Sequence, residues 1–157
     1  CFDYSEEYKF IIDDDLLPHP SLLNSMIKKD KNIIGIYGKT RVDKAQRYED
    51  LVDHWCVDEK VDFLVGSVIL VKQQALDLIK KTIVRIGYPE RGDDIIISYL
   101  LKKELNEPFL QTISGKVLNL PEGSVGLNKD SSHYSMRWNI LQKFKNNSWT
   151  DNESVVK

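Results

Sequence analysis

The chain has 157 residues, of which 41% are apolar and 29% are charged, and its formal net charge is −2. This size and apolar content predict one globular domain with a hydrophobic core, over residues 1–145, followed by a polar tail over 146–157. The charge gives no sign of a nucleic-acid partner, and we expect none. No run of about 18 apolar residues occurs, so we expect a soluble protein without a membrane span; the cytoplasm and the lumen of the secretory pathway both stay open as its location.

Short strands and helices alternate in the first half of the chain. Residues 10–12 form an apolar run that is typical of a buried strand. Pro20 begins a helix at the position that proline favours, and apolar residues at helical spacing follow it. Residues 32–37 predict a second strand. Residues 38–60 are polar and rich in charge, and we expect a long loop with room for one helical turn.

The second half continues the alternation. A short strand over residues 61–64 ends before Gly66, and a strand resumes over 68–71. Helices are expected over 73–81 and over 94–105, and the second of these is so apolar that it must be largely buried.

Two further strands and a last helix complete the pattern. Strands are expected over 108–113 and 116–120, a flexible loop over 121–132, and an amphipathic helix over 134–145. This alternation predicts an α/β fold with a mixed sheet flanked by helices.

Three consecutive carboxylates, Asp13, Asp14 and Asp15, directly follow the first predicted strand. Ligands of open α/β sheets bind where strands end, and clustered carboxylates favour a hard cation such as Mg²⁺ or Mn²⁺. If the chain stays extended, Asp13 and Asp15 point to the same side and Asp14 to the other. The alternative is an acidic turn that caps the next helix.

A second acidic pair, Asp93 and Asp94, precedes the buried helix. An aspartate there is a good N-cap and complements the helix dipole. The same surroundings keep a carboxylate ionised, as a general base or an acceptor-binding group requires. Both interpretations stay open from the residues alone.

Three basic or titratable residues are also candidates. Lys39 and Arg41 follow the second strand and are suited to an anionic ligand, although a solvated basic turn explains them equally well; the glycine spacing there does not match a phosphate-binding P-loop. His133 lies in the expected loop, where it is either solvated or the imidazole of a mixed oxygen and nitrogen metal site.

The order of these motifs resembles a known family. Along the chain come the strand with Asp13-Asp14-Asp15, the strand leading to Arg41, the sequence VDFLVGSVILV, the sequence RGDDIIISYLL and the late His133. Over residues 8–140 this order resembles the catalytic half of a GT-A glycosyltransferase, and the exostosin-like family is the nearest. The resemblance implies a GT-A-like sheet and transfer of a sugar from a UDP- or GDP-linked donor to a sugar or glycan acceptor.

The resemblance also implies a role for each motif. Asp15 and Asp13, with His133, would hold Mn²⁺ or Mg²⁺ against the nucleotide diphosphate, beside Asp14. Lys39 and Arg41 would add positive charge there, and Gly66 and Ser67 would let the donor approach the backbone. Asp94 would orient or deprotonate the acceptor hydroxyl, and Asp93 would support it. Inversion and retention of the sugar's configuration both stay open.

One departure from the family pattern is plain. GT-A enzymes carry a nucleotide-binding βαβ region before the acidic triplet, whereas only twelve residues precede Asp13. We therefore expect a catalytic half without that region. Two other functions remain: a metal-dependent phosphoryl or nucleotidyl transferase or hydrolase, because clustered aspartates also serve two-metal chemistry, and a non-catalytic binding module derived from the GT-A fold.

Overall fold

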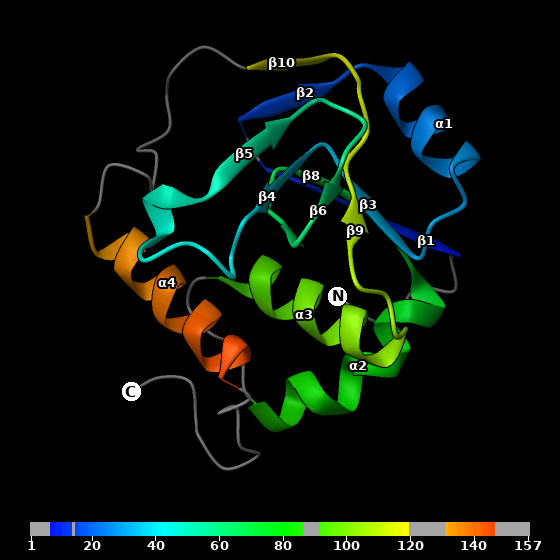
Figure 1. Cartoon of the computed structure of the whole chain (residues 1–157). Helices are drawn as coiled ribbons and strands as arrows, with labels where there is room; N and C mark the ends of the chain where they lie inside the picture. The colour runs from blue at the N-terminus through cyan, green and yellow to red at the C-terminus, as the bar shows by residue number, and fades with distance from the viewer. Residues whose placement is uncertain (1–6, 14, 87–91, 120–130, 147–157) are drawn as a thin grey trace.

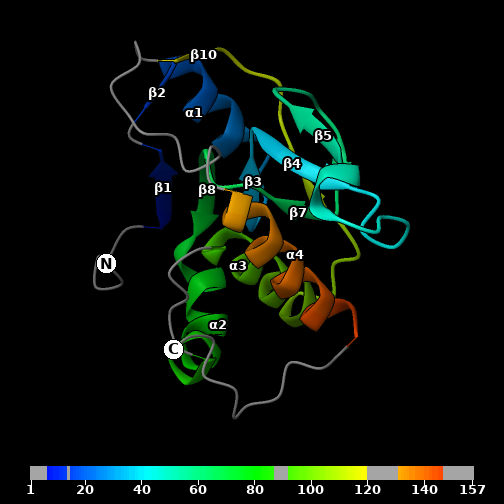
Figure 2. The ribbon, with the colours of Figure 1, turned by 90° about the vertical axis from the view of Figure 1, so that its left-hand side faces the viewer.

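The strands of this protein lie between one helix on one side and three helices on the other. The computed structural model describes residues 7–13, 15–86, 92–119 and 131–146. Two perpendicular views place α1 on one side of the strands and α2, α3 and α4 on the other (Figures 1 and 2). The four helices span Pro20–Lys28 (α1), Gln73–Ile86 (α2), Asp93–Glu104 (α3) and Ser131–Lys145 (α4).

The first sheet has three strands in the order β1-β8-β3. They span Tyr8–Ile12 (β1), Val68–Lys72 (β8) and Ile33–Gly35 (β3). Both pairs are antiparallel, with Ile12 opposite Val68 and Ile34 opposite Leu70. β8 is therefore the central strand, and the end of β1 meets the beginning of β8.

The second sheet has the order β5-β4-β7, and two smaller ribbons pair β2 with β10 and β6 with β9. All of these pairs are antiparallel, and one isolated parallel bridge joins Gly35 to Thr112. The α/β class is confirmed, but the described strands form several small antiparallel sheets instead of one mixed sheet. The bounds are Leu16–Pro18 (β2), Tyr37–Thr40 (β4), Val52–Trp55 (β5), Lys60–Val61 (β6), Phe63–Leu64 (β7), Leu110–Gln111 (β9) and Val117–Asn119 (β10).

The prediction of a long loop over residues 38–60 was wrong. This segment holds most of β4, a 3-10 turn over Tyr48–Asp50 (η1) and the strand β5, and β4 and β5 pair as a hairpin. Gly38 lets β4 pack closely, because a Cβ there would lie 2.7 Å from Cγ2 of Val61 and 2.9 Å from the carbonyl oxygen of Phe63. The expected strand over residues 32–37 is divided between β3 and β4.

The predicted helices occur, with changed bounds. α1 begins at Pro20 as expected, and the side chain of His19 caps it by accepting a hydrogen bond from the Ser21 N–H. α2 continues to Ile86, beyond the expected end at residue 81. α4 begins at Ser131, so the last residues of the expected loop are helical; residues 121–130 of that loop lie outside the described part of the chain.

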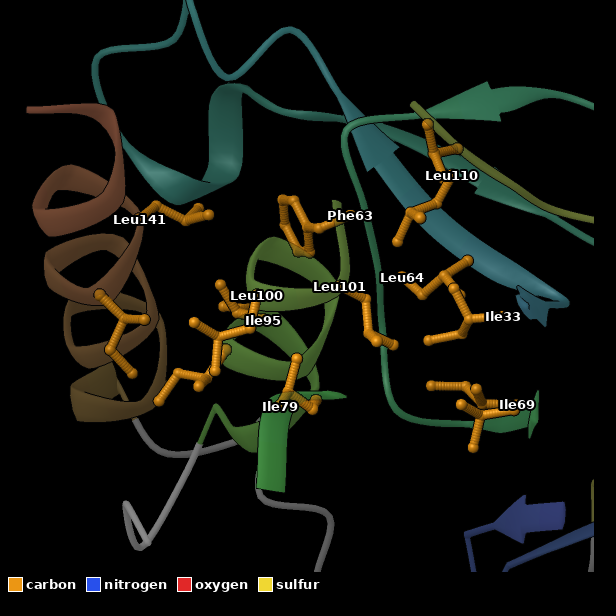
Figure 3. Packing of buried hydrophobic residues seen from close by; sticks show 14 of the residues in the cluster. Ile33, Phe63, Leu64, Ile69, Ile79, Ile95, Leu100, Leu101, Leu110 and Leu141 are labelled. Atoms are coloured by element: carbon orange, nitrogen blue, oxygen red, sulfur yellow. The ribbon is translucent and has the colours of Figure 1, made fainter. Parts of the chain in front are cut away.

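Two hydrophobic clusters share the central strand β8. Ile69 and Val71 belong to the cluster on the side of α2, α3 and α4, whereas Val68 and Leu70 belong to the cluster beneath α1. This alternation follows from the two-residue repeat of a strand. Figure 3 shows the larger cluster, in which the side chains of α3 and its neighbours meet: Ile33, Phe63, Leu64, Ile69, Ile79, Ile95, Leu100, Leu101, Leu110 and Leu141.

The helix α3 is as buried as its sequence predicts. Ile95 and Leu101 are fully buried in the larger cluster. Its one buried hydroxyl, Ser98, accepts a hydrogen bond from the Leu64 N–H of β7. The middle of α3 is consequently held against β7. None of the helices in the described part of the chain has the length and apolar character needed to cross a lipid bilayer.

Candidate functional site

The acidic triplet continues directly from β1. The Asp13 N–H donates to the carbonyl oxygen of Ser67 at 2.8 Å, which extends the β1–β8 pairing by one step. The side chains of Asp13 and Asp15 are exposed, and Asp14 lies outside the described residues. Asp13 therefore lies at the end of a strand and next to Ser67.

Asp94 is not the N-cap of α3, contrary to one of the two interpretations from sequence. The N-cap is Gly92, whose φ of 85° suits glycine, and Asp94 is the second residue of the helix. Its buried carboxylate accepts three hydrogen bonds: Oδ2 from the Gly66 N–H at 2.7 Å and from Arg137 Nη2 at 2.6 Å, and Oδ1 from the Ile95 N–H at 2.8 Å.

Arg137 of α4 is the partner that holds Asp94. Its side chain is buried, and its Nε donates to the hydroxyl of Tyr48 at 2.8 Å. Burial disfavours the charged guanidinium, but Asp94 and Tyr48, through their electrostatic interactions and hydrogen bonds, together outweigh it and raise the pKa of Arg137 above its ordinary value. Burial also raises the pKa of Tyr48 to about 12, so its hydroxyl stays protonated. We call Gly66, Asp94, Arg137 and Tyr48 the Asp94 cluster.

Asp93 lies beside this cluster and differs from Asp94. Its side chain keeps exposed surface, yet nearby protein atoms remove part of its hydration, and this desolvation, together with the charge of Asp94, raises the pKa of Asp93. A carboxylate with a raised pKa is a better proton acceptor at neutral pH than an ordinary one. The two neighbouring aspartates are thus suited to different tasks.

The acidic triplet and the Asp94 cluster meet across Gly66 and Ser67. Ser67 bonds to Asp13 through its carbonyl, and Gly66 bonds to Asp94 through its N–H. A Cβ on Gly66 would lie 3.6 Å from the Asp94 carboxylate, which is ordinary contact. Four of the residues expected at the site are consequently brought together.

Lys39 is in a different environment from the solvated basic turn that the sequence allowed. It belongs to β4, is only 7% exposed, and pairs with Oδ1 of Asp53 at 2.5 Å across the hairpin. Its ammonium group lies 4.9 Å from the ring centroid of Tyr48. Lys39 therefore contacts the Asp94 cluster, but its charge is already matched by a carboxylate.

Arg41 lies after β4 with a left-handed backbone (φ 71°) and an exposed side chain. It lines a cleft of about 480 Å³ together with Lys44, Tyr99, Phe109 and other residues. That lining includes none of the aspartates of the triplet or of the Asp94 cluster. Within the described residues, no hydrogen bond or ion pair joins Arg41 to the other expected site residues.

His133 is on the first turn of α4, not in a loop as expected. Its ring meets Tyr134 edge-on, with 5.5 Å between the centroids. Across the described parts of the chain, no group of three His, Cys, Asp or Glu side chains is arranged to hold a metal ion. Asp13 and Asp15 still offer exposed carboxylate oxygens, and Mg²⁺ is commonly held by one or two carboxylates plus substrate phosphates. The fit to a hard cation thus rests on these two residues.

Arg137 and Tyr48 were not among the residues expected at the site. One sequence signal points to Arg137: it follows His133 by four residues, so both lie on one face of the helix. Tyr48 gives no such signal, because it lies in a polar segment without a regular repeat. Both are visible only when segments far apart in the chain are brought together.

The chain matches no protein-family model, and no curated protein matches it significantly. The resemblance to GT-A glycosyltransferases therefore depends on the motifs and their order alone.

Proposed function

We propose that this protein is a metal-dependent glycosyltransferase that moves a sugar from a UDP- or GDP-linked donor to a hydroxyl of a sugar or glycan acceptor. One observation carries the proposal. The backbone of Asp13 is hydrogen-bonded to Ser67, and the buried Asp94 carboxylate is hydrogen-bonded to the adjacent residue Gly66. Exposed acids for a cation and a positioned acid for a hydroxyl are then adjacent.

The donor end would be at the triplet. Asp13 and Asp15 would hold Mn²⁺ or Mg²⁺, which when bound neutralises charge on a leaving diphosphate. Gly66 lacks a side chain and keeps partly exposed surface, so a ligand would approach the backbone at this residue, whereas Ser67 beside it is buried. The GT-A-like arrangement of the sheet is part of this proposal.

The acceptor end would be at α3. A carboxylate offers about four lone-pair directions, and the described residues use three of those on Asp94. The remaining direction would accept the hydroxyl of a bound sugar and orient it. Asp93, whose pKa is raised, would receive the proton that leaves this hydroxyl. Arg137 would keep Asp94 ionised and fixed in position.

The first test is binding of UDP or GDP by calorimetry, with Mn²⁺ and then with excess EDTA. We expect Mn²⁺-dependent binding that Asp15→Ala abolishes. Asp43→Ala is the matched control, because Asp43 is also an exposed aspartate but lies beside the separate cleft. Equal affinity in wild type and Asp15→Ala would remove the metal site from the triplet.

The products then separate the three functions. Incubation with UDP-glucose, UDP-N-acetylglucosamine or GDP-mannose should release the nucleoside diphosphate and transfer the sugar to an acceptor or to water. Release of a nucleoside monophosphate and a sugar 1-phosphate would instead indicate cleavage of the pyrophosphate bond, which is phosphoryl- or nucleotidyl-transfer chemistry. Tight Mn²⁺-dependent binding without any product would indicate a binding module.

A further inference from the structure

The β4–β5 hairpin presents four chemically distinct side chains on one face. Tyr37 and Lys39 alternate along β4, and their register partners on β5 are Trp55 and Asp53. Since directly paired residues of antiparallel strands share a face, these four side chains form one surface, which we call the hairpin face. None of the roles given above to the triplet and to the Asp94 cluster uses Asp53 or Trp55.

Asp53 has the geometry of a hydroxyl acceptor. Its Oδ1 receives hydrogen bonds from the Tyr37 hydroxyl and from Lys39 Nζ, each at 2.5 Å. Within the described residues Oδ2 receives none, and the side chain is 57% exposed. One oxygen is therefore fixed by the protein while the other is directed at solvent, where it can accept a hydrogen bond from a ligand.

Trp55 supplies an apolar surface next to this carboxylate. Trp55 is 43% exposed, and its ring meets the ring of Tyr37 edge-on, with 5.2 Å between the centroids. The edge contact restrains the indole, so ordering it on binding costs little conformational entropy. An aromatic surface beside polar acceptors suits a ligand with an apolar face and several hydroxyls, as a pyranose ring has.

The charges favour a neutral ligand. Lys39 and Asp53 form a closed ion pair, so the hairpin face carries no net charge. An anionic ligand would find no free cation among these four residues, and a cation would compete with Lys39 for Asp53. A sugar ring without ionised groups needs neither.

The hairpin face is also continuous with the Asp94 cluster. Tyr48 joins them, because Lys39 lies over its ring and Arg137 bonds to its hydroxyl. The two groups also interact electrostatically through this link. The charge of Arg137 acts to lower the pKa of Tyr37, and the charge of Asp53 acts to raise the pKa of Tyr48. A sugar on the hairpin face would thus lie beside the carboxylates proposed to act on an acceptor.

We propose that the hairpin face is the acceptor subsite and binds an uncharged pyranose ring, stacked on Trp55 and hydrogen-bonded to Asp53. The assignment of the ring to the acceptor rests on the proposed glycosyltransferase function, whereas the binding of the ring does not.

Saturation-transfer NMR with cellobiose, lactose and chitobiose tests the subsite, in EDTA and without nucleotide. At least one disaccharide should receive saturation from the wild-type protein. Trp55→Thr keeps the β propensity of the strand and should weaken the signal at least fivefold, whereas Trp55→Phe should retain more than half of it. Asp53→Asn should also weaken the saturation-transfer signal, since a neutral amide accepts hydrogen bonds less strongly than a carboxylate.

Phe109→Ala is the matched control, because Phe109 is a similarly exposed aromatic residue (48%) in the separate cleft. Its signal should stay within twofold of wild type. Absence of binding to all three disaccharides, or equal binding by wild type and a folded Trp55→Thr, would overturn the subsite. Asp15→Ala should bind the disaccharide normally, so failure of the metal site would leave this result intact.

Discussion

The Asp94–Arg137 pair stabilises the fold and, in the function proposed above, also holds the carboxylate that orients the acceptor. Both side chains are buried, at 7% and 6% exposure, and their atoms approach to 2.6 Å. Removing two charges from water is costly, and the cost is offset only while each charge has its partner. A change at Asp94 therefore affects Arg137 as well, and a loss of activity at this position needs a measurement of stability beside it.

We expect Asp94→Asn and Arg137→Met each to lower the free energy of unfolding by about 3 kcal/mol, because each leaves one buried charge without its partner. The double substitution should cost clearly less than the sum of the two. Urea denaturation of the four proteins measures both quantities through a double-mutant cycle.

Lys29→Met provides the control for that cycle. Lys29 and Asp58 also form an ion pair, at 3.2 Å, but both side chains are 43% exposed. Solvent screens such pairs, so the loss should stay below about 1 kcal/mol. Additive losses at Asp94 and Arg137 would show that the two residues contribute independently.

Individual residues differ in how far their sequence context predicts them. Asp94 was expected at the helix start as a positioned carboxylate, and it lies there, but the glycine two positions earlier is the cap. Its partners Gly66 and Arg137 are 28 and 43 residues away in the chain. Local patterns carry no information on such pairs, so the ion pair was not predictable.

The β4–β5 hairpin shows the same limit for a whole element. Its strands contain glycine, lysine, aspartate and histidine, which local propensity assigns to loops. Pairing is supported instead by contacts across the strands, such as Lys39 with Asp53 and Tyr37 with Trp55. A propensity argument therefore predicts a loop where cross-strand contacts stabilise a strand.

Two glycines near this hairpin should respond differently to the same substitution. Gly38→Ala should lower the free energy of unfolding by about 2 kcal/mol, because the new methyl group meets Val61 and the Phe63 carbonyl at less than 3.0 Å. Gly66→Ala should leave stability within about 0.5 kcal/mol, because its nearest neighbour would lie at 3.6 Å. Urea denaturation distinguishes the two.

Gly66→Ala, the substitution expected to spare stability, should nevertheless lower activity. The methyl group of Gly66→Ala lies against Asp94, so turnover of a nucleotide sugar should fall although the fold is intact. An active Gly66→Ala protein would place the donor elsewhere. A Gly38→Ala protein as stable as wild type would show that β4 can move away from Val61.

At the scale of the molecule, β8 is the element on which both cores depend. It pairs with β1 on one edge and with β3 on the other, and its side chains alternate between the two hydrophobic clusters. Opening this strand exposes both clusters at once. Its hydrogen bonds should therefore break only when the whole domain unfolds.

Amide hydrogen exchange provides the corresponding measurement. The amides of β8 should exchange most slowly, at the rate set by global unfolding, and those of β10 among the fastest, because β10 pairs with β2 alone in the described sheets and Leu118 is 67% exposed. Exchange in β8 as fast as in β10 would show that the two clusters unfold independently.

The order of strands and helices was largely predictable, because each has its own hydrophobic repeat. The way in which strands pair was not. β1 and β8 are separated by more than fifty residues, and nothing within either strand specifies its partner or register. The placement of the acidic triplet next to Ser67 follows from this pairing, so the sequence could suggest the residues of the site but not their arrangement.

The contact of Arg137 with Tyr48 has a consequence for how the chain acquires its site. These two residues are 89 positions apart, and bringing the ends of so long a segment together costs chain entropy that only later contacts return. The hairpin and each helix can begin to form from local contacts, whereas the Asp94 cluster needs η1, α3 and α4 in place together. We therefore expect the Asp94 cluster to be among the last parts of the molecule to assemble, after the helices and the β4–β5 hairpin have begun to form.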